Sequence, residues 1–450
     1  MGPFAILVSA ALASVAHATL TVQHVKIHGS SKAVEATETL PQAEYSLPIS
    51  GKTSRTPARA GIRDAIRRSM TGGDVAPLAG SDFDEEYLVN VTVGGQPFSL
   101  IVDTGSSDTW VAETGFKCYN LTGYPEPQSE CAFGTSGYNP KQSKTYTAYP
   151  NRNFNITYGD GEFLTGAVGF ETITVAGLSV PKQEFGLVTD AAWEGDGVDT
   201  GLLGLAFPNL TSVYVGTDPT KDSAANNEPY YPFFWNAVKD KLVSKPYFSV
   251  ALNRGSFAAQ ESSTYDPNLG YLAFGGVAPV ATTAPTVVAP MQGLLSQHYG
   301  FQYWYYIVDI DKYVFPGSAH LTTASNVTIL DTGTTLNYIP TDSAAAYNAA
   351  FKPPAKYSDD WGGYVVECDA KVPAFDVVIG GKSFSIDAKD QLLPLGVYEH
   401  GKELCYSGTQ DGGPAEDGNI FILGDVFLHN VVATFDIQAY QITLSQRKSY

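Results

Sequence analysis

The chain is 450 residues long, with 44% hydrophobic, 12% aromatic and 16% charged residues, so it is too apolar and too weakly charged for a disordered or coiled-coil protein. Its formal net charge of -19 argues against phosphate backbones and anionic lipid surfaces as partners, which excludes nucleic-acid binding. The 44 glycines, 27 prolines and 27 tyrosines are typical of many short strands joined by tight turns, which predicts an all-β fold.

The N-terminus carries a processing signal. An apolar stretch from Phe4 to Val15 is followed by Ala16-His17-Ala18, the form after which signal peptidase cleaves. We therefore predict that residues 1–18 are a signal peptide and that the protein is secreted. The sequence after the signal peptide contains no apolar run long enough to span a membrane and no hydrophobic C-terminal tail, so we expect no membrane anchor.

A basic leader precedes an acidic body. Between residues 19 and 80 basic residues outnumber acidic ones, whereas residues 81–450 are strongly acidic. This contrast predicts a propeptide held electrostatically over an acidic site, so that the protein carries its own inhibitor. Arg67-Arg68 is a candidate processing point, and we expect the boundary between residues 68 and 82. The alternative is a solvated linker that does not contact the body.

One sequence element occurs twice. An apolar run of β type ends in Asp-Thr-Gly-Ser at residues 103–106, and a second such run ends in Asp-Thr-Gly-Thr at residues 331–334. Each copy is followed later in the chain by a Leu-Leu-Gly or Ile-Leu-Gly element, at residues 202–204 and 422–424. The repetition predicts two copies of one lobe, an N-terminal lobe over 81–279 and a C-terminal lobe over 280–450.

The region between the two copies contains a glycine-rich tip and further elements. Tyr158-Gly-Asp-Gly suits the mobile tip of a hairpin. We expect a short helix around Pro232–Val243. Thr211–Pro229 and Gly255–Pro267 are predicted to be polar surface insertions that could widen or restrict a cleft.

Cysteines and glycosylation sequons fit an exported chain. The four cysteines form no C-x-x-C pair, so two disulfides are expected, and closeness in sequence favours Cys118–Cys131 and Cys368–Cys405. Five N-x-[ST] sequons are compatible with a eukaryotic secretory route. The glycosylation candidates are Asn90, Asn120, Asn155, Asn209 and Asn326.

The duplicated turns predict paired carboxylates. An Asp that ends a strand and precedes Thr and Gly lies in a tight turn, where the Gly lets backbone amides approach the carboxylate and the next hydroxyl donates to it. If the two lobes meet about a pseudo-dyad, Asp103 and Asp331 face each other and hold one proton over a wide acid range. One carboxylate could then activate a water while the other polarises a carbonyl. The alternative is that both are structural turn residues.

These residues resemble the pepsin-like aspartic proteases. Residues 103–111, Asp-Thr-Gly-Ser-Ser-Asp-Thr-Trp-Val, are similar to the family's first active-site motif, and residues 331–335 are similar to its second. The resemblance extends from residue 84 to residue 446. It implies a bilobal fold of two similar β-rich lobes with a cleft between them. It also implies a monomeric acid endopeptidase that cuts proteins or peptides with an activated water and needs no cofactor or metal.

The resemblance assigns roles to individual residues. Tyr158, Gly159 and Asp160 correspond to the family's flap, in which the tyrosine hydroxyl pairs with the residue at Trp110. An acidic flap residue such as Asp160 is implied to accept a basic substrate side chain, although it could equally be a solvent-facing turn residue. Both disulfide pairings fit loops of the family. The residues implied to support the two aspartates are Thr104, Gly105, Ser106, Thr332, Gly333 and Thr334.

The first motif departs from the family at one point. Asp108-Thr109 stand where a neutral residue and Leu are common, which is expected to alter the packing beneath Trp110. We also expect Tyr303-Trp304 to pack the second lobe rather than to touch substrate. The turn that carries Asp103 itself is intact.

Two other functions stay open. The first is a protein of the same fold that has lost catalysis and binds a peptide or a secreted enzyme, but both aspartates, their hydroxyl partners and Tyr158 are present. The second is a carbohydrate hydrolase with two carboxylates, which would leave the duplication of the turns unexplained. The sequence has no H-E-x-x-H and no G-x-S-x-G motif, so it lacks the residues that a zinc or serine hydrolase would need.

Overall fold

The structure is a computed structural model. It describes residues 22–23, 33–36, 39–52, 87–158, 161–195, 197–255, 265–296, 300–320, 326–415 and 420–450. The predicted signal peptide, residues 1–18, and the candidate processing point at Arg67-Arg68 lie outside these ranges.

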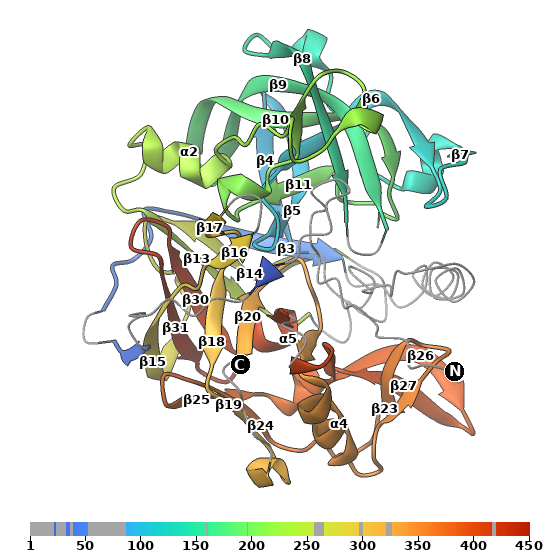
Figure 1. Cartoon of the computed structure of the whole chain (residues 1–450), viewed down its shortest axis with the longest axis vertical. Coiled ribbons are helices and arrows are strands. Elements are labelled where there is room, and N and C mark those ends of the chain that lie inside the picture. The colour runs from blue at the N-terminus through green and yellow to red at the C-terminus, as the bar shows by residue number, and fades with distance from the viewer. Residues whose placement is uncertain are drawn as a thin grey trace.

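Most strands belong to one sheet of sixteen, which runs from the upper part of the molecule in Figure 1 into its middle. Its central path follows the order β12-β8-β9-β10-β6-β11-β5-β4-β3-β14-β13-β30-β31-β15-β2, with β7 paired to β6. In chain order these strands are β2 (Val34–Glu35), β3 (Tyr45–Lys52), β4 (Leu88–Val93), β5 (Gln96–Asp103), β6 (Thr109–Tyr119), β7 (Pro125–Glu126), β8 (Thr147–Thr157), β9 (Phe163–Val175), β10 (Leu178–Ala192), β11 (Gly201–Gly204), β12 (Val213–Val215), β13 (Tyr247–Leu252), β14 (Tyr265–Phe274), β15 (Thr282–Pro290), β30 (Val431–Asp436) and β31 (Gln441–Arg447).

Smaller sheets and short helices complete the fold, mostly in the lower part of Figure 1. The sheet that carries the second Asp-Thr-Gly turn contains β18 (Ile307–Ile310), β20 (Asn326–Leu330), β21 (Asn337–Ile339), β28 (Thr409–Asp411) and β29 (Phe421–Leu423). The other strands are β1 (Val22–Gln23), β16 (Leu294–Ser296), β17 (Gly300–Gln302), β19 (Lys312–Val314), β22 (Lys356–Ser358), β23 (Gly363–Glu367), β24 (Phe375–Ile379), β25 (Lys382–Ile386), β26 (Leu392–Glu399) and β27 (Lys402–Ser407). The helices are α2 (Phe233–Lys239), α4 (Thr341–Ala349) and α5 (Asp425–Leu428), and the 3-10 turns are η1 (Gln128–Cys131), η2 (Pro140–Gln142), η3 (Pro208–Leu210), η4 (Pro219–Lys221), η5 (Ser318–His320) and η6 (Ala388–Gln391).

Local sequence explains the hairpin that leads to the first turn. β4 and β5 pair antiparallel across Gly94 and Gly95, whose φ angles of 58° and 82° suit a tight hairpin turn. Residues of β4 alternate largely between the core and the surface, as a strand with one buried face requires. β5 ends at Asp103 and pairs in parallel with β11, so Gly204 lies opposite Asp103. The second lobe repeats this arrangement, because β29 pairs in parallel with β20 just before Asp331.

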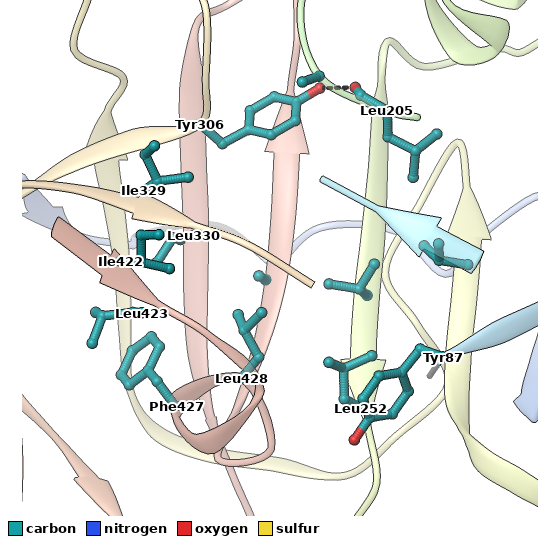
Figure 2. Packing of buried hydrophobic residues seen from close by; sticks show 14 of the residues in the cluster. Tyr87, Leu205, Leu252, Tyr306, Ile329, Leu330, Ile422, Leu423, Phe427 and Leu428 are labelled. Atoms are coloured by element: carbon teal, nitrogen blue, oxygen red, sulfur yellow. Dashed lines mark hydrogen bonds between the residues drawn. The ribbon is translucent and has the colours of Figure 1, made fainter. Parts of the chain in front are cut away.

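A shared core connects the two halves of the molecule. Figure 2 shows side chains of the second half, such as Leu330 and Phe427, in the same cluster as Leu252. The Tyr306 hydroxyl donates a hydrogen bond to the Leu205 carbonyl at 2.6 Å, so the cluster also holds the polypeptide just beyond β11. This packing fixes the two duplicated turns relative to each other.

The predicted disulfides and helix are present. Cys118 bonds Cys131 with an S–S distance of 2.01 Å, and Cys368 bonds Cys405 with 2.09 Å, which confirms both pairings. The predicted short helix is α2, which starts directly after Pro232. Within the described ranges, no helix has the length and the apolar character to cross a membrane.

Candidate active site

The first turn surrounds the carboxylate of Asp103 with donors from its own segment. The Gly105 amide donates to Asp103 Oδ1 at 2.6 Å, and the Ser106 hydroxyl donates to Asp103 Oδ2. The side chain is 7% exposed. These bonds are local, because donor and acceptor lie within three residues, so the sequence of the turn alone determines them.

The second turn repeats the geometry. The Gly333 amide donates to Asp331 Oδ1 at 2.9 Å, and the Thr334 hydroxyl donates to Asp331 Oδ2 at 2.7 Å. Asp331 is 3% exposed. Hydroxyl donors of both turns therefore hold one oxygen of each carboxylate.

Two threonines clamp the turns to each other. The Thr104 hydroxyl donates to the Leu330 carbonyl at 2.9 Å, and the Thr332 hydroxyl donates to the Val102 carbonyl at 2.7 Å. Each hydroxyl also accepts the backbone N–H of the other threonine, at 3.0 and 3.1 Å. The four buried bonds form a nearly symmetric lock between the two halves, and they fix the separation of the aspartates.

The glycine of each turn lies directly against the carboxylate of the opposite turn. A Cβ added to Gly105 would lie 2.5 Å from Asp331 Oδ1, and one added to Gly333 would lie 2.6 Å from Asp103 Oδ1. Any side chain at either glycine would therefore push the opposite aspartate away, which explains why both turns carry Gly.

Burial raises the pKa values of both aspartates, and the charge of Asp103 raises that of Asp331 further. Burial, followed by the negative charge of Asp103, raises the pKa of Asp331 to about 7. Burial likewise raises the pKa of Asp103, against hydrogen bonds from Ser106 and Gly105 that lower it. The arrangement therefore retains a proton through the acid range, and this proton belongs to the pair.

The hairpin between β8 and β9 places Tyr158 beside the first turn. Trp110 Nε1 donates to the Tyr158 hydroxyl at 2.8 Å, and Trp193 packs edge-on against both rings. The hairpin closes through the Gly161 amide, which donates to the Tyr158 carbonyl at 3.1 Å. Gly159 and Asp160, two residues of the predicted flap, lie outside the described residues.

Sequence reasoning missed Tyr305, which lies next to Asp331. β18 pairs antiparallel with β20, and the Leu330 amide donates to the Tyr306 carbonyl at 3.0 Å, so the same register places Tyr305 opposite Asp331. Tyr305 is 2% exposed, and its hydroxyl has no hydrogen-bond partner among the described residues. Burial and the charges of both aspartates raise its pKa, so the hydroxyl stays protonated. No motif marks this residue, because only the strand pairing brings it to the site. The neighbouring Tyr303 instead packs against Phe207 and Tyr440.

The unusual Asp108 is fully buried beneath the first turn. It accepts the Ser212 amide on both oxygens, at 3.0 and 2.9 Å, and the Tyr230 hydroxyl at 2.8 Å. Burial raises its pKa to about 6, although these hydrogen bonds oppose the shift. Asp108 thus binds Ser212 near the start of the Thr211–Pro229 segment and Tyr230 directly after its end. The beginning of this segment is buried rather than a polar surface insertion, because Val213 and Tyr214 pack inward and β12 pairs with β8.

Comparison with known proteins agrees with this geometry. A model of the family "Eukaryotic aspartyl protease" matches residues 86–447. The chain is 38% identical over 365 residues to a probable aspartic-type endopeptidase of Aspergillus fumigatus, covering 79% of this chain and 77% of that protein. It is 30% identical over 437 residues to rhizopuspepsin-2 of Rhizopus niveus, covering 91% of this chain and 95% of that protein.

The fold is also that of a solved relative. The crystal structure of an aspartic proteinase from Irpex lacteus is similar with a TM-score of 0.61 at 23% identity, over 81% of this chain and 94% of that one. The expected all-β, pepsin-like fold is confirmed. The chain therefore belongs to the eukaryotic aspartyl protease family and is an aspartic-type endopeptidase.

Proposed function

We propose that this endopeptidase is secreted and hydrolyses proteins at acid pH with Asp103 and Asp331 as its catalytic pair. The observation that carries the proposal is the interaction between two buried carboxylates that are held by matching turns and clamped by Thr104 and Thr332. Glu171, another buried acid, is instead surrounded by hydroxyl donors from Tyr138, Ser143 and Thr145.

The reaction uses a water between the carboxylates. The ionised member of the pair removes a proton from the water, and the protonated member donates a hydrogen bond to the carbonyl of the peptide bond. Water oxygen attacks the carbonyl carbon while the protonated member gives its proton to the carbonyl oxygen, which yields a neutral tetrahedral diol. The member that took the water proton then gives it to the departing nitrogen as the C–N bond breaks, and one hydroxyl of the diol returns its proton to the other carboxylate, which leaves the pair with one proton again. Ser106 and Thr334 orient the outer carboxylate oxygens throughout. No covalent intermediate with the enzyme forms.

A proteolysis assay tests this function directly. Secreted protein, treated with acid to allow processing, is incubated with casein or haemoglobin at about pH 3 to 5, with and without a statine-type transition-state analogue. Hydrolysis that the analogue abolishes supports the proposal. Correctly folded and processed protein that cuts neither substrate would contradict it, and peptide binding without hydrolysis would then be the leading function.

The pH profile should report the shared proton. Because the pKa of Asp331 is raised to about 7, the single proton of the pair is lost as the pH rises toward neutrality, and activity falls with it. The hydrogen bond from Thr334 lowers the pKa of Asp331, so Thr334→Val should raise it and move the alkaline limb of kcat/KM upward by about 0.5 to 1 pH unit. Thr334→Ser, which keeps the hydroxyl, is the control and should leave the limb in place. If the alkaline limb of Thr334→Val does not move, Asp331 is not the group whose loss of a proton lowers the activity.

The flap contributes to substrate binding through Tyr158. Tyr158→Phe removes the acceptor of the Trp110 N–H and leaves this buried donor unpaired. We expect kcat/KM for a peptide substrate to fall about tenfold, because the hairpin loses its fixed position over the cleft. Tyr149→Phe on β8, the strand that precedes Tyr158, loses only a bond to Glu228 and should retain wild-type activity. Equal kinetics of the two variants would argue against a role for the flap.

Asp160 is proposed to bind a basic side chain of the substrate.

The secretory route should leave glycans at selected sequons. The Asn120 side chain lies in a turn near the surface, in which the Thr122 hydroxyl donates to Oδ1 at 2.7 Å and Nδ2 donates one bond, to Glu126 Oε1 at 3.2 Å. Asn155 instead donates to the Pro219 carbonyl at 3.1 Å and to Asp222 at 3.0 Å, bonds that a glycan would break. We expect glycopeptide mass spectrometry to find Asn120 occupied and Asn155 unmodified. The reverse pattern would be incompatible with this fold.

The positions of the other three sequons differ. Asn90 is exposed on β4, Asn209 donates to Gln302 at 3.1 Å, and Asn326 begins β20.

We further propose that residues 19–80 inhibit the enzyme until they are cut from the body. We also propose that lobes over 81–279 and 280–450 form the cleft, and that the enzyme is a monomer.

A further inference from the structure

A cavity of about 190 Å³ is formed by segments that are far apart in the sequence. Its lining residues are 254, 385–387, 429–430 and 446–450, which lie after β13 and α5 and at the ends of β25 and β31. One water needs roughly 10 to 15 Å³ of such space, so the cavity is large enough for a small ion with its water. None of the lining residues belongs to either Asp-Thr-Gly turn, so the cavity is separate from the proposed catalytic pair.

This cavity gathers arginines on an acidic protein. Residues 81–450 contain 41 acidic and 19 basic residues, and only three of the basic residues are arginines. Arg254 and Arg447 line the cavity, and the third, Arg152 on β8, forms an ion pair with Glu228. The planar guanidinium group offers paired N–H donors that match two oxygens of an oxyanion, so two arginines at one cavity favour the binding of an anion.

Arg447 is a buried cation without an acidic partner. It is 8% exposed, and it forms no ion pair with any of the residues that the structure describes. Its guanidinium group donates instead to neutral oxygens, namely the Leu252 carbonyl, Asn253 Oδ1 at 2.7 Å and the Tyr450 hydroxyl at 3.2 Å. Burial, with a further contribution from the positive charge of Arg254, lowers the pKa of Arg447. A buried charge is unfavourable unless an opposite charge compensates it, so Arg447 lacks a counter-ion.

Arg254 and Arg447 both lie over the ring of Tyr450. Arg254 Cζ is 4.5 Å from the centre of the ring, and Arg447 Cζ is 4.1 Å from it. Arg254 has acidic partners, because it donates to Asp390 Oδ1 at 2.5 Å and to Oδ2 at 2.8 Å, and Asp387 lies 3.6 Å away. These carboxylates compensate the charge of Arg254, but the charge of Arg447 remains.

We propose that this cavity binds a small oxyanion, either an inorganic one such as sulfate or the carboxylate of an organic acid. Arg447 supplies the charge that needs a partner, Arg254 lies beside it, and Lys448 lines the cavity at the exposed surface. The anion stabilises the folded protein, because an ion that binds only the folded state shifts the equilibrium away from the unfolded state. This site goes beyond proteolysis and does not depend on the proposed catalytic function.

Calorimetric titration with sodium sulfate tests the site directly. The wild-type protein is kept at one acid pH and at constant ionic strength with sodium chloride, and sodium citrate is used in a second titration to distinguish an inorganic from an organic source. We expect at least one of the two anions to bind with a dissociation constant of about 1 mM or below. At about 10 mM this anion should raise the Tm by at least about 2 °C over chloride, a concentration too low for a general salt effect on burial.

Three single-charge variants provide the matched comparison. Arg447→Gln should weaken the binding of the anion at least about tenfold, because it removes the uncompensated charge. Arg152→Gln removes the third arginine at a distant ion pair, and it should bind the anion like the wild type. Lys448→Gln changes an exposed side chain, so it should fold even if Arg447→Gln does not, and it should weaken binding about threefold.

Each outcome decides for or against the site. Binding that Arg447→Gln or Lys448→Gln weakens and Arg152→Gln leaves unchanged supports it. Equal binding by the wild type, Arg447→Gln and Lys448→Gln would place the bound anion elsewhere on the protein and refute the proposal. If neither anion gives a heat of binding and the Tm follows ionic strength alone, the protein itself compensates Arg447 and the proposal is wrong. Because no measurement uses proteolysis, a failure of the proposed catalytic function would leave these results unaffected.

Discussion

Replacing either of the proposed catalytic aspartates, Asp103 or Asp331, by asparagine is expected to lower kcat/KM for a peptide substrate at least about 1,000-fold. An amide cannot take a proton from the attacking water, and it cannot give one to the leaving nitrogen. Because the two carboxylates share one proton, Asp103→Asn and Asp331→Asn should be inactive to a similar extent, and the double variant should be hardly worse than either. Kinetics with a fluorogenic peptide at acid pH provide the measurement.

The loss of activity must be separated from a loss of fold. Burial raises the pKa values of both aspartates, so each is favoured in its neutral form, which asparagine resembles in size and charge. Both variants should therefore keep the wild-type Tm at acid pH, and Asp331→Asn should exceed it at pH 7. Asp376→Asn, a surface substitution in the same half of the chain, should retain full activity. Substantial hydrolysis by Asp331→Asn would place the chemistry elsewhere.

The second large effect is on stability, through Asp108. Burial raises its pKa from 3.8 to about 6 in the folded protein. A raised pKa means that the folded state binds the proton more tightly than the unfolded state. The stabilisation is therefore complete below about pH 4 and is lost as the pH rises through about 6. A shift of about two units corresponds to about 3 kcal/mol, which is a large share of the stability of an ordinary protein.

Asp108→Asn should flatten this dependence. Asparagine cannot ionise, so the Tm of the variant is expected to fall less than that of the wild type between pH 4 and pH 7. At pH 4 the variant should have the lower Tm, because its amide fits the donors from Ser212 and Tyr230 less well. Thermal unfolding followed by circular dichroism across this range measures the difference. An identical pH slope in the variant and the wild type would show that Asp108 is not the titrating group.

A substitution at Glu171 should change the stability with the opposite pH dependence. Glu171 is also buried, but hydrogen bonds from Ser143, Thr145, Tyr138 and the Thr172 amide outweigh its burial and lower its pKa. Its contribution is present above the ordinary pKa of glutamate and is lost as the pH falls. Glu171→Gln should therefore destabilise the protein more at pH 7 than at pH 3, the reverse of Asp108→Asn.

The sequence predicted well those features that depend on neighbouring residues. The bonds from Gly105 and Ser106 to Asp103 span two and three residues, and the duplication predicted the same turn at Asp331. The disulfides followed from closeness along the chain, and the motif similar to that of a known family predicted the fold.

Only the tertiary structure decided which distant segments meet at these turns. Ser212 reaches Asp108 from 104 residues away, Tyr305 lies beside Asp331 through the register of β18 and β20, and β3 enters the central sheet from a segment that its composition assigned to a removable leader. Turn chemistry acts over a few bonds, so the local sequence determines it. Strand register and the burial of a carboxylate depend on how the whole core packs, and no local pattern contains that information.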